Sequence, residues 1–432
     1  MKEDILQALM DWNPWLTESF PEELLGISRP YNLITYLDIP EIKILEGARR
    51  VGKSTLLYQV VHHLYQMDKR ILYINFEDEV LRKYPLSQII NTYMSHASVE
   101  FLFVDEIQNC PDWVQTIRKM YDRREMKQIW ISGSNSTLIK QEYATLLTGR
   151  NLTIHISPLS FDEFLLFKNV KFKKSGLSTK DHIVYKKLFK EYCEYGAFPA
   201  IVNRSVLKKE LLLSYFDDFI YKDIVARHNT NATKTKDFGI YLATHSSKFF
   251  SFRNIADALK LHLNTIIDYF SYFKEAFLFD ELYKFDYSLK KQHSYDKKIY
   301  CLDVGLASAV SFKFSDDRGR ILENIVFSEL KRRNKEIYFH KDIVECDFVV
   351  KKELKITQAI QVTFSLDDKK TFDRETKGLL EAMACYKLTQ GLILTESEED
   401  KLEIEHDSKK YTVHIMPIWK WLLNKDLGAS LI

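Results

Sequence analysis

The segment with the clearest chemical meaning is the loop from residue 47 to residue 54, Gly-Ala-Arg-Arg-Val-Gly-Lys-Ser. It matches the pattern GxxxxGK[ST] of a phosphate-binding loop. Gly47 and Gly52 let the backbone turn its amide groups toward phosphate oxygens, and the helix that follows directs its positive end to the same place. Lys53 is expected to reach the β- and γ-phosphates, and Ser54 a magnesium ion. The loop therefore predicts binding of a nucleoside triphosphate with Mg²⁺.

Asp105 and Glu106 are the second set of candidate residues, and they directly follow the apolar run Phe101–Val104. A buried strand that ends in two carboxylates delivers them to the carboxyl edge of a parallel sheet, where α/β folds bind ligands. There Asp105 would hold the magnesium ion, directly or through water, and Glu106 would polarise the attacking water. Two acids after a strand are also found in ordinary solvated turns, but the phosphate-binding loop favours the catalytic interpretation.

Two more positions could act on the γ-phosphate. Ser132, Ser134 and Asn135 lie at the end of the next apolar strand, where a polar side chain can sense the phosphate or simply cap a helix. Arg150 directly precedes a further strand and could reach a neighbouring subunit's γ-phosphate or cap the preceding helix. The predicted nucleotide contacts are Gly47, Ala48, Arg49, Arg50, Val51, Gly52, Lys53, Ser54, Thr55 and Ser132.

The elements around these residues follow from the periodicity of the chain. From about residue 41 to 157, the short runs EIKILEG, RILYINF, FLFVDE, QIWISGS and NLTIHIS alternate with helical patterns, as in a parallel sheet covered by helices. From about 160 to 290 the pattern is helical. Strands return from about 297 as KIYCLDV, EIYFHK, ECDFVVKK, AIQVTFS and GLILTE, with helices at ILENIVFSELKRRN and ETKGLLEAMACYKL, so a second α/β unit is expected.

Composition limits the class of protein. A chain of 432 residues with 46% hydrophobic and 28% charged residues is expected to fold into two to four domains, which excludes disorder. The formal net charge of +2 gives no reason to expect nucleic acid to wrap the whole surface. There is no apolar run of membrane-spanning length and no secretory signal, so a cytoplasmic protein without membrane association is expected. The five scattered cysteines indicate neither a zinc site nor a disulfide framework.

Taken together, these motifs make the chain resemble the AAA-type P-loop ATPases of bacteria and archaea that carry a C-terminal domain related to restriction endonucleases. The resemblance spans nearly the whole chain. It rests on the ordered segments GARRVGKSTLL, FLFVDEIQN, ISGSNS, LTGR followed by ISPLSFDEFL, YGAFPAIV, KDIVARH, KIYCLDVGL, and LENIVFSEL with ECDFVV.

The resemblance implies an α/β fold with a core sheet of strand order 5-1-4-3-2. It also implies a division into a helical lead-in at 1–40, the ATPase core at 41–160, a helical lid at 161–235, a winged-helix-like segment at 236–296 and a restriction-endonuclease-like domain at 297–432. Preference for ATP over GTP rests on the resemblance alone. By position, Arg150 is similar to the family's arginine before the fifth strand, and whether it acts within one chain or between chains is open.

The winged-helix expectation can be tested on the residue pattern. Phe252–Leu259 and Leu263–Phe270 are typical of two short amphipathic helices joined by a tight turn. The second helix is predicted to expose Asn264, Thr265, Asp268 and Ser271, without a cation before Lys274, whereas helices that read DNA usually present cations or amides. Basic residues that could form a solvated face or follow phosphates are Lys290, Lys291, Lys297, Lys298, Lys331, Arg332 and Arg333. DNA and a protein are both open as partners.

The last domain departs from the nuclease pattern at one position that matters. Nucleases of this fold gather magnesium with an acid on a helix, an Asp on a strand and an acid-x-Lys triplet on the next strand. Glu323 and Asp347 are plausible metal ligands, but the triplet is Gln361-Val-Thr363, which lacks both the acid and the lysine. We therefore expect a degenerate, catalytically inactive site. The alternative is that Lys351 or the next lysine takes the missing role.

Three functions are consistent with these residues. The leading hypothesis is an ATPase switch that uses ATP and Mg²⁺ and couples its nucleotide state to a partner through the lid, winged-helix and nuclease-like parts. The alternative is an ATP-regulated, metal-dependent nuclease acting on DNA or RNA through Glu323 and Asp347. The third is a module that holds ATP and barely hydrolyses it, against which Glu106 argues. If Arg150 acts between chains, the active form is a homo-oligomer.

Overall fold

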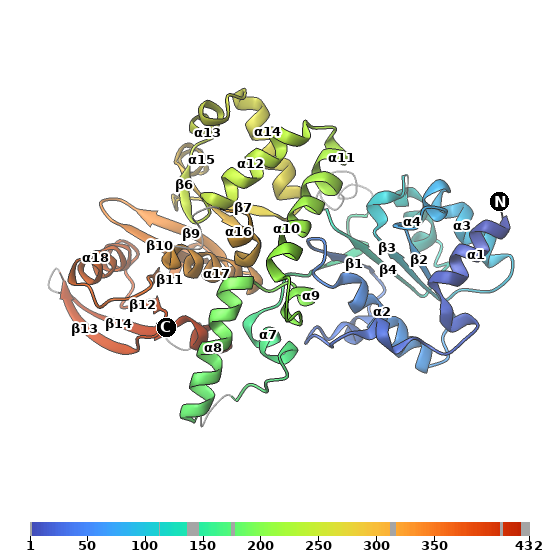
Figure 1. Cartoon of the computed structure of the whole chain (residues 1–432), viewed down its shortest axis with the longest axis horizontal. Helices are drawn as coiled ribbons and strands as arrows, with labels where there is room; N and C mark the ends of the chain where they lie inside the picture. The colour runs from blue at the N-terminus through green and yellow to red at the C-terminus, as the bar shows by residue number, and fades with distance from the viewer. Residues whose placement is uncertain are drawn as a thin grey trace. The chain divides into compact units, whose positions relative to one another are not determined.

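The computed structural model describes residues 2–111, 113–135, 147–173, 178–311, 317–406 and 409–424. Ser136, the last residue of the segment ISGSNS, therefore lies outside the described residues. The chain forms two compact units (Figure 1): Met1–Ser157 with Glu275–Phe277, and Pro158–Lys274 with Leu278–Ile432. We call them the first and the second unit, and each is described by itself.

The first unit is built on a parallel five-stranded sheet of order β2-β3-β4-β1-β5. The strands are β1 (Ile42–Glu46), β2 (Ile71–Asn75), β3 (Phe101–Asp105), β4 (Gln128–Gly133) and β5 (Asn151–His155). Read from the opposite edge, this is the order 5-1-4-3-2, so the expected AAA-type sheet is confirmed. It places β1 and β4 side by side in the middle, which brings their carboxyl ends together.

The two faces of this sheet follow from the alternation of side chains along each strand. In β1, β2 and β3 the even-numbered residues, such as Ile44 and Val104, join one apolar core with α1 (Lys2–Trp12), α3 (Leu86–Met94) and α4 (Trp113–Asp122). In β4, where Ile129 is opposite Leu102 of β3, the odd-numbered Ile129 and Ile131 join that core. The alternate residues point the other way, toward α2 (Lys53–Gln66), whose Tyr58 stacks on Tyr73 of β2. Asp105 and Ser132 belong to this second face by the same alternation. The period of two therefore sends both side chains to the side of the sheet that α2 covers.

The lead-in to the sheet is a helix followed by short turns. After α1 come the 3₁₀ turns η1 (Pro14–Leu16), η2 (Glu22–Leu25) and η3 (Leu33–Asp38). Two shorter turns, η4 (Leu81–Lys83) and η5 (Ile107–Asn109), follow β2 and β3. Asn13, which is fully buried, joins α1 to the sheet because its side chain bonds the backbone of Tyr73 in both directions, at 2.7 and 2.8 Å. The predicted helical lead-in thus packs on the core of the first unit.

The second unit begins with helices. They are α7 (Phe161–Phe167), α8 (Thr179–Tyr195), α9 (Pro199–Val202), α10 (Lys208–Asp218), the π-helical turn η6 (Phe219–Val225), α11 (Ala226–His228) and α12 (Ala232–Thr244). Capping boxes start two of them, with Ser160 at α7 and Ser178 at α8. Such a box satisfies the free amide groups of a first helical turn, and it agrees with the helical pattern expected after residue 160.

A small antiparallel sheet follows. Its strands β6 (Lys248–Phe250), β7 (Phe279–Leu282) and β8 (Lys297–Cys301) have the order β6-β8-β7. Between β6 and β7 lie α13 (Phe252–Leu259) and α14 (Leu263–Glu275), and α15 (Leu289–Ser294) precedes β8. β8, which begins at the residue where the last domain was expected to start, pairs with β6 and β7 of this small sheet.

The chain ends in a six-stranded mixed sheet of order β13-β14-β12-β11-β10-β9. Its strands are β9 (Glu336–Lys341), β10 (Glu345–Lys352), β11 (Lys355–Val362), β12 (Gln390–Thr395), β13 (Asp400–His406) and β14 (Lys409–Pro417). The helices of this region are α16 (Val304–Val310), α17 (Arg318–Arg332), α18 (Lys369–Tyr386) and α19 (Ile418–Leu423). The hairpin β13–β14 and α19 were not anticipated, since charged residues fill the exposed hairpin.

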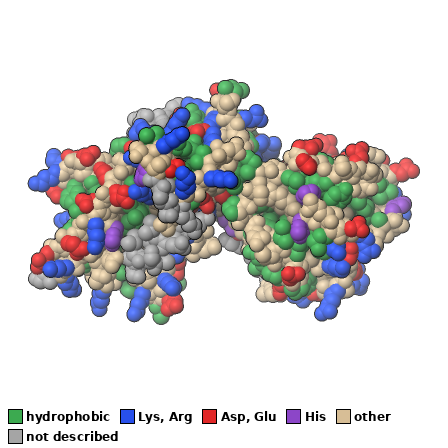
Figure 2. All heavy atoms as spheres, turned by 90° about the horizontal axis from the view of Figure 1, so that it is seen from below, with side chains coloured by type: hydrophobic (Ala, Val, Ile, Leu, Met, Phe, Trp, Pro, Cys, Tyr) green, Lys and Arg blue, Asp and Glu red, His purple; other side chains and the backbone are tan. Residues whose placement is uncertain are grey.

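Charged side chains of both signs share the visible surface of the molecule. On the face shown in Figure 2, Lys and Arg side chains are interspersed with Asp and Glu and do not gather into one basic patch. Among the described residues, none of the helices combines the length and the hydropathy that crossing a bilayer requires.

Candidate nucleotide site

The loop between β1 and α2 has the backbone that its two glycines predict. Gly47 has a φ of 151°, and a Cβ atom there would lie 2.1 Å from the carbonyl oxygen of Ile156. Gly52 has a φ of 95°, in the left-handed region, directly before the first residue of α2. A side chain at Gly47 would clash with backbone, and one at Gly52 would strain the turn. Both glycines are therefore required by the path of the loop.

Lys53 begins α2, and its ammonium folds back over the loop. It is 4% exposed, and its Nζ donates to the carbonyl oxygens of Gly47 at 3.0 Å and Ala48 at 2.9 Å. The loop is also held from outside by Arg29, whose guanidinium donates to the carbonyl oxygens of Val51 at 2.8 Å and Ser157 at 3.0 Å. Sequence reasoning missed Arg29, since nothing marks a lone arginine in the lead-in as a partner of this loop.

The remaining loop residues differ in their surroundings. The guanidinium of Arg49 pairs with Glu77 at 2.7 Å, while Arg50 is exposed and has a φ of 67°. Thr55 lies against the lead-in, because a Cβ atom at Gly26 would come within 3.1 Å of its Cγ2. Thr55 therefore contacts the lead-in, whereas Arg50 is exposed.

Asp105 lies at the centre of a cluster of hydroxyl groups. It is fully buried, and it accepts hydrogen bonds from the hydroxyls of Tyr73 at 2.6 Å, of Ser132 and of Ser54. Burial, followed by the charge of Glu106, raises the pKa of the Asp105 carboxyl, and the three hydroxyls act against that rise. The structure thus joins the serine of the loop to the first acid of β3, two residues that sequence reasoning assigned to one magnesium ion.

Glu106 follows Asp105 in a left-handed turn, with a φ of 51° and only 7% exposure. Its carboxylate accepts hydrogen bonds from the amide of Gln108 and from the hydroxyl of Ser134 at 3.3 Å. Its own backbone amide donates to Ser132 at 3.2 Å. At the end of β4, the hydroxyl of Ser132 therefore donates to Asp105, and the hydroxyl of Ser134 donates to Glu106. Gln108 and Tyr73 were not anticipated.

Arg150 lies at the amino ends of the parallel strands, whereas the phosphate-binding loop lies at their carboxyl ends. In the parallel pair β1–β5, Ile42 is opposite Asn151 and Glu46 is opposite His155, so Arg150 precedes the amino end of β5. The loop follows the carboxyl end of β1, a strand length of roughly 16 Å away. The guanidinium of Arg150 pairs instead with Asp122 at 2.8 Å. A contact between Arg150 and the phosphate-binding loop of the same chain is therefore excluded.

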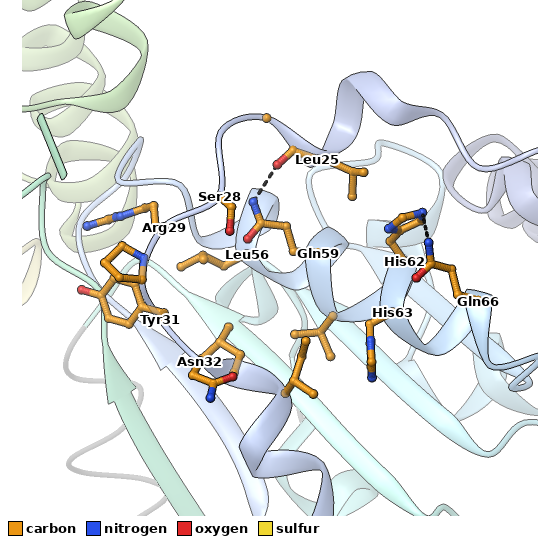
Figure 3. Close-up of a pocket in the computed structure, with 15 residues that line it drawn as sticks. Leu25, Ser28, Arg29, Tyr31, Asn32, Leu56, Gln59, His62, His63 and Gln66 are labelled. Atoms are coloured by element: carbon orange, nitrogen blue, oxygen red, sulfur yellow. Dashed lines mark hydrogen bonds between the residues drawn. The ribbon is translucent and has the colours of Figure 1, made fainter. Parts of the chain in front are cut away.

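A cavity of about 600 Å³ runs along α2 between this helix and the lead-in (Figure 3). Tyr31 and Asn32 line it from the lead-in, and Leu56, Gln59 and His63 line it from α2. Gln59 is fixed by a hydrogen bond of 2.7 Å to the carbonyl oxygen of Leu25. Leu56 and Arg29 both line the cavity, and the second of them holds the loop, so the cavity adjoins the phosphate-binding loop. Its size is that of a small-molecule site.

Glu323, Asp347 and Gln361, the residues expected in the degenerate nuclease site, do lie together in the second unit. Both acids contact the ammonium of Lys298. The ammonium of Lys298 lies 2.7 Å from a carboxylate oxygen of Glu323 and 3.0 Å from one of Asp347. The side-chain oxygen of Gln361 accepts a hydrogen bond from the backbone N–H of Asp347 at 3.2 Å. Lys351, one of the two lysines that could have taken the missing role, pairs instead with Glu336 at 2.7 Å.

The other basic residues named as a candidate face are mostly paired. Lys298 is 3% exposed, and Lys297 pairs with Glu281 at 2.9 Å. Both Arg332 and Arg333 pair with Glu329. Lys290 and Lys291 are exposed, and Lys331 pairs with Asp280 at 2.8 Å. The stretch therefore presents far fewer cations to a ligand than its sequence suggests.

Comparisons with other proteins identify an AAA domain and two relatives that match most of the chain. Residues 40–165 match a family described as an AAA domain, and residues 186–317 match a domain of unknown function. The chain is 36% identical to the uncharacterized protein MJ1544 of Methanocaldococcus jannaschii over 402 residues, which cover 89% of this chain and 88% of that protein. An uncharacterized protein of Haemophilus influenzae is 33% identical over 393 residues, 86% of this chain and 94% of its own length.

Solved structures give a weaker comparison. AMPPCP-bound DnaA from Aquifex aeolicus aligns with 14% identity and a TM-score of 0.28, covering 60% of this chain and 93% of that one. A score this low supports no inference about the activity of this chain.

Proposed function

Because this chain belongs to the same family as MJ1544 and carries an AAA domain, we propose that it binds ATP and hydrolyses it to ADP and phosphate. The observation that carries the proposal is the meeting of Ser54, Asp105 and Glu106 at the carboxyl edge of one sheet. They come from a helix, a strand end and a turn. A module that only held ATP would not require the second acid.

The residues around Asp105 fit a magnesium ion. Hard divalent cations take oxygen ligands, and the hydroxyl of Ser54 and the carboxylate of Asp105 are already in contact. The buried Asp105 carboxyl is surrounded by hydroxyl donors, which leave its negative charge for a cation to balance. When bound, the ion neutralises charge that develops on the transferred phosphate. Ser54 and Asp105 would hold it, while Lys53 would exchange its contacts with the loop carbonyls for phosphate oxygens.

Glu106 is the proposed base that orients the attacking water. Its left-handed turn presents the carboxylate beside Gln108 and Ser134, and both donate to it. Ser134 lies at the end of β4 and contacts this base. It is therefore a stronger candidate for sensing the γ-phosphate than Ser132, whose hydroxyl donates to Asp105. Asn135, buried at the same strand end, is the third candidate.

The cavity along α2 is the proposed site of the nucleoside. It begins where the first turn of α2 ends, so a nucleotide whose phosphates lie on the loop could extend its base between Tyr31 and Gln59. The polar side chains there, Asn32 and Gln59, offer amide groups that can bond the edge of a base. Preference for ATP over GTP would be decided by these contacts, and an Asn32→Ala variant should reduce the preference.

Arg150 is proposed to act on a neighbouring chain. Its own loop lies at the other edge of the sheet, so only a second copy could bring a γ-phosphate near it. The proposal makes the active form an oligomer. Hydrolysis per chain by Arg150→Ala should fall, and addition of Lys53→Ala subunits, which keep Arg150, should restore part of the rate. A rate that is unchanged in Arg150→Ala would contradict this role.

The nucleotide state is proposed to control a partner through the second unit. Outward residues of α14, the helix that would read DNA in a winged helix, are Asn264, Ile267, Asp268 and Ser271. This surface has an acid and a 42% exposed isoleucine, which favour a protein over a nucleic acid. The paired state of most nearby basic residues supports the same choice. DNA remains the second candidate.

The test of the proposal is steady-state ATP hydrolysis by the purified chain, compared with Glu106→Gln. The substitution removes the base and keeps the shape of the side chain, so hydrolysis should fall by about 100-fold or more while ATP still binds. Lys53→Ala is the control that should also lose binding. Turnover that is unchanged in Glu106→Gln would favour a module that only holds ATP. Stimulation by duplex or single-stranded DNA would favour DNA as the partner.

A further inference from the structure

The feature that carries a further inference is the buried cluster around Lys298 in the second unit. The Lys298 ammonium contacts carboxylate oxygens of Glu323 at 2.7 Å and Asp347 at 3.0 Å, and it also pairs with Glu345. The lysine is 3% exposed, so these three carboxylates surround a charge that water does not reach. An ammonium group has three donors, and three acidic residues are here to accept them.

Local structure positions this lysine firmly. Lys298 and Tyr300 lie two residues apart on β8 and so share one face of the strand, and both contact the same oxygen of Glu323. Tyr300 is held in turn by stacking on Phe327 of α17, with ring centroids 4.0 Å apart and planes 5° apart. Glu323 and Phe327 are four residues apart on one face of α17. Strand and helix are thus fixed to each other beside the cluster.

The glutamine that replaces the expected acid is also fully used. The side-chain oxygen of Gln361 accepts the backbone N–H of Asp347 at 3.2 Å, and its amide nitrogen donates to Glu375. The second oxygen of Asp347 accepts the backbone N–H of Val362 at 2.9 Å. Gln361 therefore orients the strand pair β10–β11, and both polar atoms of its side chain have partners within the chain.

The charges of the cluster keep Lys298 protonated. Burial by itself would lower the pKa of Lys298, but the charges of Glu323 and Asp347 outweigh burial and raise that pKa well above its ordinary value. Burial also raises the pKa of Glu323, to about 8, and the Lys298 ammonium acts against that rise. Lys298 is therefore held as an ammonium in the folded chain.

A divalent metal ion does not fit this arrangement. The resemblance to nucleases implies a metal between Glu323 and Asp347, but those oxygens already coordinate a cation of the protein itself. A second cation at the same oxygens would be held against the ammonium by like charge in a buried setting, where repulsion is poorly screened. The missing lysine of the triplet has not been replaced by a catalytic one either, since an ammonium bound by three carboxylates is not available to activate water.

We propose that Lys298 is a permanent internal cation that occupies the place of the metal, so that the nuclease-like region binds no divalent ion and cleaves no phosphodiester. Its carboxylates instead join the three-stranded sheet, through β8, to α17 and the six-stranded sheet. The residues of a former active site have become a structural junction.

The test is Mn²⁺ binding to the full-length, nucleotide-free chain, measured by the electron paramagnetic resonance of free Mn²⁺. The wild type and Asp347→Asn should bind Mn²⁺ equally, because the cluster contributes no site. Lys298→Met, which is unbranched, one atom shorter and uncharged, should gain one site at least tenfold tighter than any in the wild type. The matched control Lys298→Met with Asp347→Asn should lose that site.

Two outcomes would overturn the proposal. The first is a wild-type Mn²⁺ site, or DNA cleavage with Mg²⁺ or Mn²⁺, that Asp347→Asn abolishes. The second is a folded Lys298→Met variant that binds no more Mn²⁺ than the wild type, since Lys298 would then not be what excludes the metal. If Lys298→Met fails to fold, the comparison of wild type with Asp347→Asn still decides, because it needs no change at the lysine.

Discussion

Asp105 in the first unit and Asp347 in the second are both buried carboxylates on strands, yet they meet opposite partners. The hydroxyls of Ser54, Ser132 and Tyr73 donate to Asp105, and all of them are neutral. Asp347 is held by the ammonium of Lys298 and a backbone amide. Hydroxyl donors orient a carboxylate but leave its charge in place, whereas an ammonium cancels it.

The difference shows how two buried acids that were both expected to bind a metal can serve two purposes. Asp105 was expected to hold magnesium because it follows an apolar run downstream of a phosphate-binding loop, and Asp347 because the resemblance to nucleases implies a metal ligand there. What separates them is the supply of a cation. The site in the first unit receives its cation from solution together with the nucleotide, in our proposal, whereas the site in the second unit carries its own. In this proposal, the buried Lys298 is the feature that distinguishes the cluster around Asp347 from the site around Asp105.

The largest expected difference between the two sites is in ATP hydrolysis after one carboxylate is neutralised in each unit. Asp105→Asn should reduce ATP hydrolysis by about 100-fold or more, because a charged ligand of the proposed magnesium ion is lost. Asp347→Asn should leave the rate per folded molecule within about twofold of the wild type. Steady-state phosphate release measures both. Equal losses of activity in the two variants would contradict this distinction, because Asp347 would then also be required for hydrolysis.

A pH effect on stability is expected from Glu323 in the cluster around Lys298. Burial raises the pKa of Glu323 from its ordinary value of 4.5 to about 8, so between these values the folded chain holds a proton that the unfolded chain has released. The unfolded state binds fewer protons there, and the free energy of unfolding should fall as the pH rises, by at most about 1.4 kcal/mol per pH unit. Lys298, Tyr300 and Asp347 are the titratable groups that face Glu323.

Glu323→Gln isolates this contribution, because Gln keeps the shape of the side chain and cannot titrate. Urea unfolding at several pH values should show a shallower decline for the variant than for the wild type. The difference between the two curves matters, because burial also raises the pKa of Asp303, to about 6, and that group contributes to both. Parallel curves for wild type and variant would show that Glu323 is charged throughout this range.

The smallest expected effect concerns the hydroxyls of the first unit. Tyr73→Phe removes one of three donors to Asp105 and should lower the free energy of unfolding by about 1 kcal/mol, since the other two hydroxyls remain. Urea unfolding measures the change, and Tyr58→Phe, which removes only the hydroxyl that bonds to Tyr73, separates that bond from the one to Asp105. A loss of several kcal/mol would mean that Asp105 depends on Tyr73 as strongly as a buried ion pair depends on its partner.

Much of the first unit could be read from the residue order. Glycines at fixed spacing, an apolar run that ends in two acids and the alternation of strands with helices all express local rules of the backbone. They were enough to identify the parallel sheet and to place Lys53, Ser54, Asp105 and Glu106 on its carboxyl edge. The division of the chain at residues 160, 235 and 296, by contrast, is still a prediction in its finer detail.

The contacts between side chains that are distant in the sequence could not be predicted from the residue order. Arg29 reaches the loop from the lead-in, and Tyr73 reaches Asp105 from a neighbouring strand, because the fold brings distant segments together. Lys298 was mistaken for part of a basic surface, since a lysine in a sequence carries no sign of burial. Only the pairing of β8 with β6 and β7 turns it toward Glu323.

The sequence by itself determined the chemistry that local geometry can hold, which is a phosphate-binding loop followed by an acidic strand end. The tertiary structure decided which charges meet. It placed Arg150 at the far edge of the sheet from its own loop, and it placed an ammonium where a metal was expected. The physical reason is that backbone turns and side-chain alternation depend on neighbours along the chain, whereas the energy of a buried charge depends on every group that surrounds it.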